Sequence, residues 1–409
     1  MSGEPLRVGV DATTWPNDRG FGRLTRELVT ALAARDTGYH YTLLFDQEPE
    51  VDLPGGVDVV CASTRSNLDE SASGDRSRSG GYLWRLGQAA RRGRFDVFFF
   101  PSVYSYFPIP SRVPCVVCYT DATAARFGKM LFPTRLNRWL WNAKTALARL
   151  QTTRAMTISQ SAAADLEAFY GFPPSRIDVI TCAADERFRV LDDPSAPAAA
   201  RARQDIPADA DLLVFVGGMN RHKNVISLLQ ALPRVIAAHP GVHLAVVGST
   251  SGEGFWDNVP ELQAFVQADD VLSRQVHFTG RLEDEELVAL LNGAAALVFP
   301  SLWEGFGLPA VEAMSCGVPV LASDRSSLPE VVGPAGRLFD PEDVDSIADC
   351  VIDFLGDPEQ RVRLAGETLP QAARFSWTRA AELAEESLRR CYEDRARADG
   401  RRAEVSTAP

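Results

Sequence analysis

Two hydrophobic periods alternate along this chain. Short apolar runs of strand length recur, and between them apolar residues return every three or four positions, as on one face of a helix. In the first half the strand-like runs cover residues 7–11, 41–45, 57–60, 96–100, 113–119, 155–159 and 178–180. In the second half they cover residues 212–216, 243–247, 276–278, 296–299, 320–322 and 337–339. Two successive β–α series predict an α/β fold with two Rossmann-like, doubly wound domains facing a central cleft.

Composition predicts where these domains divide. Residues 191–210 are rich in Pro, Ala and charge, which is typical of a linker. The predicted domains are therefore residues 1–190 and 211–375. An amphipathic helix is expected over residues 376–392, and the charged, Ala-rich residues 393–409 are predicted to form a disordered tail.

Overall charge and cysteine usage exclude several classes of protein. The net charge of −12 over 409 residues argues against a globally basic nucleic-acid-binding protein. The seven cysteines are scattered, and Cys115 and Cys118 fall in a strand that would point them to opposite faces, so we expect no disulfide or metal pair. Because the chain has neither an N-terminal signal nor an apolar run of roughly 20 residues, we expect a cytoplasmic location.

The stretch 299–317, FPSLWEGFGLPAVEAMSCG, carries the first candidate site. It predicts a strand, a loop with Glu304, and a helix with Glu312 one turn inside. Gly305 and Gly307 allow the backbone to approach a ligand, and the helix N-terminus favours an anion. Carboxylates accept hydrogen bonds from sugar hydroxyls while N–H groups hold phosphate, so a sugar nucleotide fits; a common strand–loop–helix turn is the simpler alternative.

A second loop follows the first strand of the second half. Arg221 and Lys223 stand there beside the pair Gly217–Gly218, just before a helix. Two cations on one loop can neutralise a diphosphate without a metal. Lys223 is one of only three lysines in the chain, the others being Lys129 and Lys144.

No metal site is predicted. Asp343 and Asp345 form a DxD pattern, but with Asp340 as N-cap they suit the start of a helix. The five histidines lack metal-ligand spacing.

The first half contributes fewer candidates. Gly20 and Gly22 lie between the first strand and the first helix, where they could bring the backbone close to a phosphate. Asp121 follows the strand-like run 113–119, at the strand end that faces the ligand crevice of an open parallel sheet.

Residues 126–154 hold seven basic residues and no acidic one. With Thr134 as N-cap, one helix face carries Leu136, Leu140, Ala143, Leu147 and Leu150, and the other carries Arg138, Trp141 and Arg149. In an acidic protein, a basic face with a Trp could contact anionic lipid or an anionic acceptor, whereas an ordinary solvated face is the simpler alternative. Peripheral contact with the inner membrane face is therefore an open expectation.

Five ordered segments resemble retaining glycosyltransferases of family four, which have the GT-B fold. They are DRGFGRLTREL, TISQSAAADLEAFYGFPPSRIDVITCAADERF, VGGMNRHKN, PSLWEGFGLPAVEAMSCGVPVLASDRSSLPEVVG and FSWTRAAEL. The last resembles the family's C-terminal helix that crosses back to the N-terminal domain. The form of the VGGMNRHKN segment resembles a Lys-Asn subgroup of the family.

The resemblance implies roles for named residues. Glu304 would hold hydroxyls of the donor sugar, Glu312 the ribose, and Arg221 with Lys223 the diphosphate. Backbone contacts would come from Gly218, Gly305, Phe306, Gly307 and Leu308, from the loop with Gly20 and Gly22, and, for the base, from near Arg281. The implied activity is metal-independent, cofactor-free, retaining transfer of a hexose from a nucleoside-diphosphate sugar to a hydroxyl acceptor.

Two positions depart from the family pattern. Thr120 precedes Asp121 where relatives often have His, and Gly218 stands where many carry Arg, a role that Arg221 could take over. Three alternatives follow: a sugar-nucleotide epimerase of the same fold, a glycan phosphorylase, for which no lysine stands out as a pyridoxal anchor, and a non-catalytic sugar-nucleotide binder.

Overall fold

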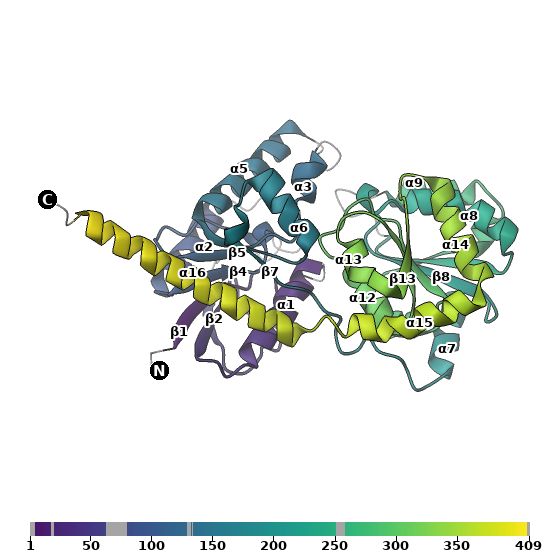
Figure 1. Cartoon of the computed structure of the whole chain (residues 1–409), viewed down its shortest axis with the longest axis horizontal. Coiled ribbons are helices and arrows are strands. Elements are labelled where there is room, and N and C mark those ends of the chain that lie inside the picture. The colour runs from purple at the N-terminus through teal and green to yellow at the C-terminus, as the bar shows by residue number, and fades with distance from the viewer. Residues whose placement is uncertain are drawn as a thin grey trace. The chain divides into compact units, whose positions relative to one another are not determined.

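The computed structural model describes residues 5–17, 20–62, 80–128, 132, 134–250 and 258–406. The chain forms two compact units, one of Met1–Cys182 with Trp377–Pro409 and one of Ala183–Ser376 (Figure 1). Each unit is built on one parallel β-sheet. The predicted α/β class with two Rossmann-like sheets is confirmed.

The first unit contains a seven-stranded sheet in the order β3-β2-β1-β4-β5-β6-β7. Its strands are β1 (Leu6–Asp11), β2 (Tyr39–Phe45), β3 (Asp58–Cys61), β4 (Val97–Phe100), β5 (Cys115–Cys118), β6 (Thr152–Thr157) and β7 (Ile177–Val179). Its helices are α1 (Gly20–Ala33), α2 (Gly80–Arg92), α3 (Thr123–Arg126), α5 (Arg135–Gln151), α6 (Gln160–Asp165) and α16 (Trp377–Ser406). The successive residues Phe98, Phe99 and Phe100 are all fully buried, so both faces of this sheet are covered.

The second unit contains a six-stranded sheet in the order β10-β9-β8-β11-β12-β13. Its strands are β8 (Asp211–Val216), β9 (Val242–Val247), β10 (Val276–Gly280), β11 (Ala296–Phe299), β12 (Val320–Ser323) and β13 (Gly336–Phe339). Its helices are α7 (Ser195–Arg203), α8 (Val225–Ala238), α9 (Val259–Gln267), α10 (Leu272–Gln275), α11 (Asp284–Asn292), α12 (Leu308–Ser315), α13 (Leu328–Val332), α14 (Val344–Gly356) and α15 (Pro358–Ala372). The strand order reverses between β8 and β11, which makes this point the expected ligand crevice of the sheet.

The structure divides the chain differently from the predicted boundaries. The second unit begins at Ala183, and the predicted linker contains α7, which packs on α11. Helix α16 continues to Ser406, through most of the predicted disordered tail. Ion pairs one turn apart, such as Arg389 with Glu393 at 2.6 Å and Arg395 with Asp399 at 3.0 Å, support that extension.

One local prediction about a helix start is corrected and another is confirmed. Helix α14 begins at Val344 rather than just after Asp340, because Asp343 is the N-cap and its carboxylate accepts from the N–H of Asp345 at 3.0 Å. In α5 the predicted cap holds, since the Thr134 hydroxyl accepts from the Asn137 N–H at 3.1 Å.

The faces of α5 are the reverse of the expectation. Trp141 packs inward, with its ring 5.1 Å from that of Tyr104, and Thr145 and Ala148 are buried. The leucine face points outward instead, with Leu136 62% and Leu150 81% exposed. Trp141 of the predicted basic face therefore points inward, whereas Arg138 and Arg149 of the same face are exposed.

Helix α16 is joined to the first unit by a buried carboxylate, Glu385. Arg35 Nε donates to Glu385 at 3.0 Å, Thr37 Oγ1 donates to the same carboxylate, and Tyr41 OH donates at 3.3 Å. The Tyr39 hydroxyl also donates to the Glu385 carbonyl at 3.0 Å. Burial and the Glu385 charge raise the pKa of Tyr41 well above its ordinary value, so that the phenol remains a donor.

A second buried carboxylate, Asp178 of β7, lies between β6 and α16. Arg154 donates to it through Nε at 2.6 Å and Nη2 at 2.9 Å, and Ser387 Oγ donates at 2.7 Å. Burial alone would raise the pKa of Asp178, but these hydrogen bonds and the charges of Arg154 and Arg390 lower it below its ordinary value. The ionised carboxylate therefore stabilises the docking of α16.

We predict a pH-dependent loss of stability for Asp178→Asn. Because the pKa of Asp178 is lower in the folded state, its contribution is present above the unfolded pKa of about 3.9 and disappears as the pH falls through the folded pKa. At pH 7 the variant should lose about 3 kcal/mol, or roughly 6–12 °C in the melting temperature of this unit by calorimetry. The difference from wild type should narrow below about pH 4.

Asp349→Asn is the matched control, because Asp349 pairs with Arg234 on the surface and is 57% exposed. It should change stability by less than about 1 kcal/mol. An equal loss at pH 7 and at low pH for Asp178→Asn would show that shape, not charge, holds α16.

Candidate functional site

The crevice of the second sheet is formed by two loops that follow adjacent strands. Residues 217–224 follow β8 and residues 300–307 follow β11, and these strands pair in parallel. The Leu302 N–H donates to the His222 carbonyl at 2.8 Å, which ties the two loops together. The predicted cationic loop and the predicted glutamate loop therefore meet at the point where the strand order reverses.

Lys223 and Glu304 form an ion pair across these loops. Lys223 Nζ lies 2.7 Å from Glu304 Oε1 and 2.9 Å from Oε2, and the side chains are only 19% and 10% exposed. The ammonium also lies 5.9 Å from the ring centre of Phe299. An anionic ligand that reaches Lys223 would compete with Glu304, and the released carboxylate could then accept hydroxyl hydrogen bonds.

Asn224 fixes the loop that carries Lys223. Its backbone is left-handed, with φ of 56°, a conformation that Asn tolerates better than most residues. Its side-chain amide donates to the carbonyls of Pro300 at 3.2 Å and Pro341 at 2.7 Å, and its oxygen accepts from Ser227 at 2.7 Å. No role was predicted for Asn224, although it follows Lys223 in the Lys-Asn pattern and stands just before a helix.

Two serines fix the loop that carries Glu304. The Glu304 N–H donates to Ser326 Oγ at 2.9 Å, and Ser327 Oγ donates to the carbonyls of Glu304 at 3.1 Å and Phe306 at 2.8 Å. Both serines were missed because they follow β12, some twenty residues further along the chain. Their hydroxyls orient the backbone of Glu304 rather than its carboxylate, so they act as positioning residues.

Gly307 joins the glutamate loop to α12. Its φ is 98°, and a Cβ there would lie 2.7 Å from Leu328 Cδ2, so only glycine fits without a shift. Helix α12 offers few N–H donors in its first turn, because Pro309 has none and the Ala310 N–H donates to the Gly307 carbonyl at 2.9 Å. Glu312 lies in α12 as predicted but is only 3% exposed.

Glycines also line the carboxyl ends of the neighbouring strands. A Cβ at Gly248 would lie 2.1 Å from the Gly217 carbonyl oxygen, and the Gly248 N–H donates to the Gly280 carbonyl at 3.0 Å. Gly218 and Arg281 follow β8 and β10 and are exposed. Gly248 therefore lets the ends of β8, β9 and β10 pack closely together at this edge of the sheet.

The second predicted cation lies apart from the central pair. Arg221 is 65% exposed, and its Nη2 pairs with Glu261 of α9 at 3.3 Å. The structure thus brings Lys223 and Glu304 together, whereas Arg221 lies on the solvent side of the same loop.

The glycines of the first unit have a structural role. Gly20 and Gly22 belong to the first turn of α1, not to the predicted loop before it. A Cβ at Gly22 would lie 1.9 Å from the Asn17 carbonyl oxygen, so the glycine permits α1 to pack on residues 14–17. Arg26 Nη1 donates to the carbonyls of Trp15 at 2.6 Å and Asn17 at 2.9 Å, which holds that segment in place.

Asp121 follows β5 at the carboxyl end of the first sheet. Its carboxylate accepts from the Thr123 N–H at 2.8 Å and from Thr120 Oγ1 at 3.3 Å. Thr120, which stands where relatives often have His, thus contacts the neighbouring aspartate. The described hydrogen bonds of Asp121 stabilise the turn into α3.

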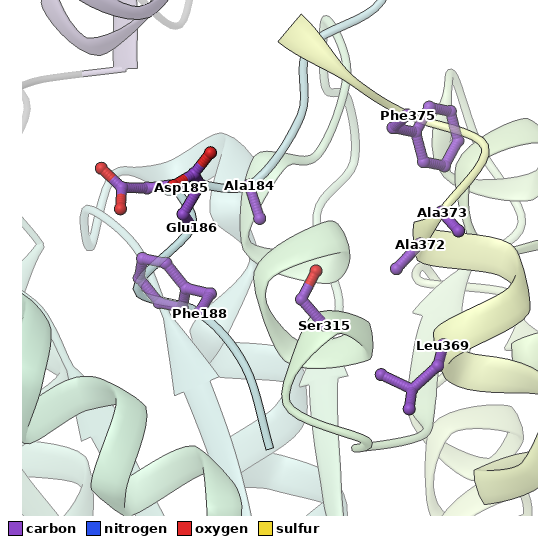
Figure 2. A pocket seen from close by; sticks show the side chains of 9 residues that line it. All are labelled: Ala184, Asp185, Glu186, Phe188, Ser315, Leu369, Ala372, Ala373 and Phe375. Atoms are coloured by element: carbon purple, nitrogen blue, oxygen red, sulfur yellow. The ribbon is translucent and has the colours of Figure 1, made fainter. Parts of the chain in front are cut away.

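The second unit also has a hollow of about 270 Å³ that contains none of the predicted site residues (Figure 2). Asp185 and Phe188 face Ser315 of α12, with Leu369 and Phe375 beyond. The Phe375 ring meets Phe306 of the glutamate loop edge-on, with ring centres 5.4 Å apart. A ring contact therefore connects the lining of the hollow to the glutamate loop, but neither Lys223 nor Glu304 lines the hollow.

Metal and membrane features were searched over the described parts of the chain. There, His, Cys, Asp and Glu side chains do not gather in groups of three or more suited to a metal ion. Every described helix is too short or too polar to traverse a bilayer.

Two family models match successive parts of the chain. Residues 19–188 match the model of glycosyltransferase family 4, and residues 198–368 match the model of glycosyl transferases group 1. Serotype-specific mannosyltransferase WbdA of Escherichia coli is 32% identical over 254 residues, which cover 61% of this chain and 30% of that protein. D-inositol 3-phosphate glycosyltransferase of Frankia alni is 34% identical over 237 residues, which cover 56% of this chain and 57% of that protein. The chain spans about a third to just over half the length of these relatives.

Solved structures share the fold across nearly the whole chain. Sucrose-phosphate synthase from Thermosynechococcus elongatus has a TM-score of 0.73 at 19% identity, covering 95% of this chain and 99% of that one. WaaG, a glycosyltransferase involved in lipopolysaccharide biosynthesis, has a TM-score of 0.71 at 18% identity, covering 93% and 99%. HepE from Anabaena, solved in complex with UDP and glucose, has a TM-score of 0.70 at 18% identity, covering 94% and 99%. With the paired parallel sheets, these similarities show that the chain has the GT-B fold, and each of the two glycosyltransferase family models matches one part of it.

Proposed function

We propose that this protein transfers a hexose from a nucleoside-diphosphate sugar to a hydroxyl acceptor, with retention of anomeric configuration and without a metal ion or cofactor. The Lys223–Glu304 pair carries the proposal, because it places a cation for phosphate and a carboxylate for sugar hydroxyls in one crevice. The fold of HepE, solved with UDP and glucose, supports a nucleotide-sugar donor. The mannosyltransferase WbdA supports a hexose.

We assign the donor contacts around this pair. Lys223 and the more exposed Arg221 would hold the diphosphate, and Glu304 would hold sugar hydroxyls. Glu312 would reach the ribose through its small exposed edge. Backbone groups would also contact the donor. They belong to Gly218, Gly305, Phe306, Gly307, Leu308 and the segment at Arg281. Gly20, Gly22 and Asp121 of the first unit keep the roles that the family resemblance implies for them.

The chemistry follows from where charge develops. The bond between the anomeric carbon and the diphosphate oxygen breaks through an oxocarbenium-like transition state, and negative charge grows on the departing phosphate. Because the first turn of α12 offers few N–H donors, Lys223 would stabilise most of that charge. The acceptor oxygen would attack on the face that the diphosphate leaves and give its proton to the departing phosphate oxygen, which retains the configuration without a covalent nucleophile.

Lys223→Ala should lower turnover at least about a hundredfold, the loss typical of removing one such charge contact. The measurement is release of nucleoside diphosphate in the presence of acceptor. Arg234→Ala, which removes a 49% exposed cation of the same unit, should leave turnover unchanged. Turnover near that of wild type in Lys223→Ala would refute the assigned role.

Glu304→Gln tests the role of the carboxylate separately from that of the Lys223 cation. Binding of the free nucleoside diphosphate should persist or tighten, because the carboxylate that competes for Lys223 is gone. Sugar transfer should fall by on the order of a hundredfold, because the amide accepts donor hydroxyls less strongly than a carboxylate. Loss of nucleotide binding with transfer retained would contradict both assignments.

A thermal-shift screen with UDP, GDP and dTDP sugars identifies the donor. A ligand at 100 times its Kd stabilises the folded state by about 2.7 kcal/mol, so the matching sugar nucleotide should raise the melting temperature. The shift should disappear in Lys223→Ala. A new sugar formed from the donor alone would indicate an epimerase, and tight binding without turnover would indicate a non-catalytic binder.

A further inference from the structure

Helix α5 presents its apolar side to solvent. Five large side chains form what we term the α5 stripe: Leu136 (62% exposed), Trp139 (64%), Leu140 (47%), Leu147 (49%) and Leu150 (81%). At 3.6 residues per turn these positions fall on one side of the helix. Isolated exposed leucines are ordinary in folded proteins, whereas a contiguous apolar stripe of this kind marks a contact surface.

The opposite side of α5 is fixed to the first unit. The Trp141 ring packs 5.1 Å from Tyr104, and Lys144 Nζ donates to the Tyr104 carbonyl at 2.5 Å. Arg149 Nη1 donates to the Tyr170 carbonyl at 2.7 Å, and Thr145 is buried. These contacts prevent the helix from turning its stripe inward.

Helix α1 of the same unit shows the usual arrangement. Its Leu24, Leu28 and Leu32 are all nearly or fully buried. Both helices are amphipathic. They differ because the first unit covers the apolar side of α1 but leaves the apolar side of α5 exposed. Only an occupant from outside the described first unit would remove the α5 stripe from water.

Charge identifies the chemistry of that occupant. Helix α5 with its N-cap, residues 134–151, contains four basic residues and no acidic one, in a chain whose net charge is −12. Arg135 and Arg138, at the start of α5, are exposed. Leucine and tryptophan on one side of a helix with arginine beside them is the pattern of helices that lie in the headgroup region of membranes.

A second copy of the chain fits this surface less well. In a two-fold dimer α5 would face a second α5, which contains no acidic residue, so Arg135 and Arg138 would find no carboxylate on the facing helix. An anionic lipid surface instead offers phosphates to the arginines and acyl chains to the stripe.

We propose that α5 docks the first unit on an anionic phospholipid surface. The stripe lies at the boundary between headgroups and acyl chains, and Arg135 and Arg138 contact lipid phosphates. This surface is separate from the proposed donor site, so its test does not depend on the transfer reaction.

The test is co-sedimentation of the full chain with vesicles of phosphatidylcholine alone or mixed with phosphatidylglycerol. We expect binding to the mixed vesicles to be at least about tenfold stronger and to weaken at high salt. The double variant Trp139→Ser, Leu150→Ser should lower binding to the mixed vesicles by about tenfold or more, because both side chains would enter the interface. Its melting temperature should stay unchanged, because both positions are exposed.

Val362→Ser is the matched control, because Val362 is 75% exposed on α15 of the second unit. It should bind vesicles like wild type. Arg135→Glu with Arg138→Glu should reduce binding to mixed vesicles and remove its salt dependence.

Three results would overturn the proposal. The first is no binding to mixed vesicles. The second is binding that the stripe variant leaves unchanged. The third is a dimer in sedimentation equilibrium that dissociates in the stripe variant, which would assign the stripe to a second copy of the chain.

Discussion

The ion pair between Lys223 and Glu304 is the contact on which the candidate site depends. Removing two charges from water costs free energy that their attraction only partly returns, so such a pair is a poor way to stabilise a fold. Here it brings together two groups that suit different parts of one ligand. Asn224 and Ser327 secure the two loops through backbone carbonyls, so that the charged groups can exchange partners while the loops stay fixed.

Much of this arrangement could be predicted from local sequence. Continuous apolar runs such as VFFF over residues 97–100 indicate strands covered on both faces, and both sheets follow from such runs. The meeting of Lys223 with Glu304 follows as well, because the carboxyl ends of parallel strands share one edge. The roles of Asn224 and Ser327 could not be predicted, because their partners are distant in sequence and are set by tertiary contacts.

The predictions for α5 and for the C-terminal residues were wrong because each sequence pattern allowed two interpretations. The periodicity of α5 defines a leucine side and a basic side, but the packing of Trp141 on Tyr104 decides which side faces inward. The charged residues after Tyr392 suit a disordered tail by composition, yet their spacing also suits ion pairs along a helix. Gly22 has a packing role beside the Asn17 carbonyl that its sequence pattern does not reveal, and its predicted ligand contact stays a prediction.

The first unit is assembled from both ends of the chain, since α16 supplies Ser387 and Arg390 to Asp178 and Glu385 to the Arg35 cluster. During synthesis on the ribosome, residues 183–376 emerge complete before α16 does. The second unit can therefore reach its native state first. Until α16 docks, the Asp178 carboxylate of β7 lacks Ser387 and Arg390 and remains exposed to water. The first unit, although it holds the N-terminal residues, can complete its native contacts only after the second unit has been synthesised.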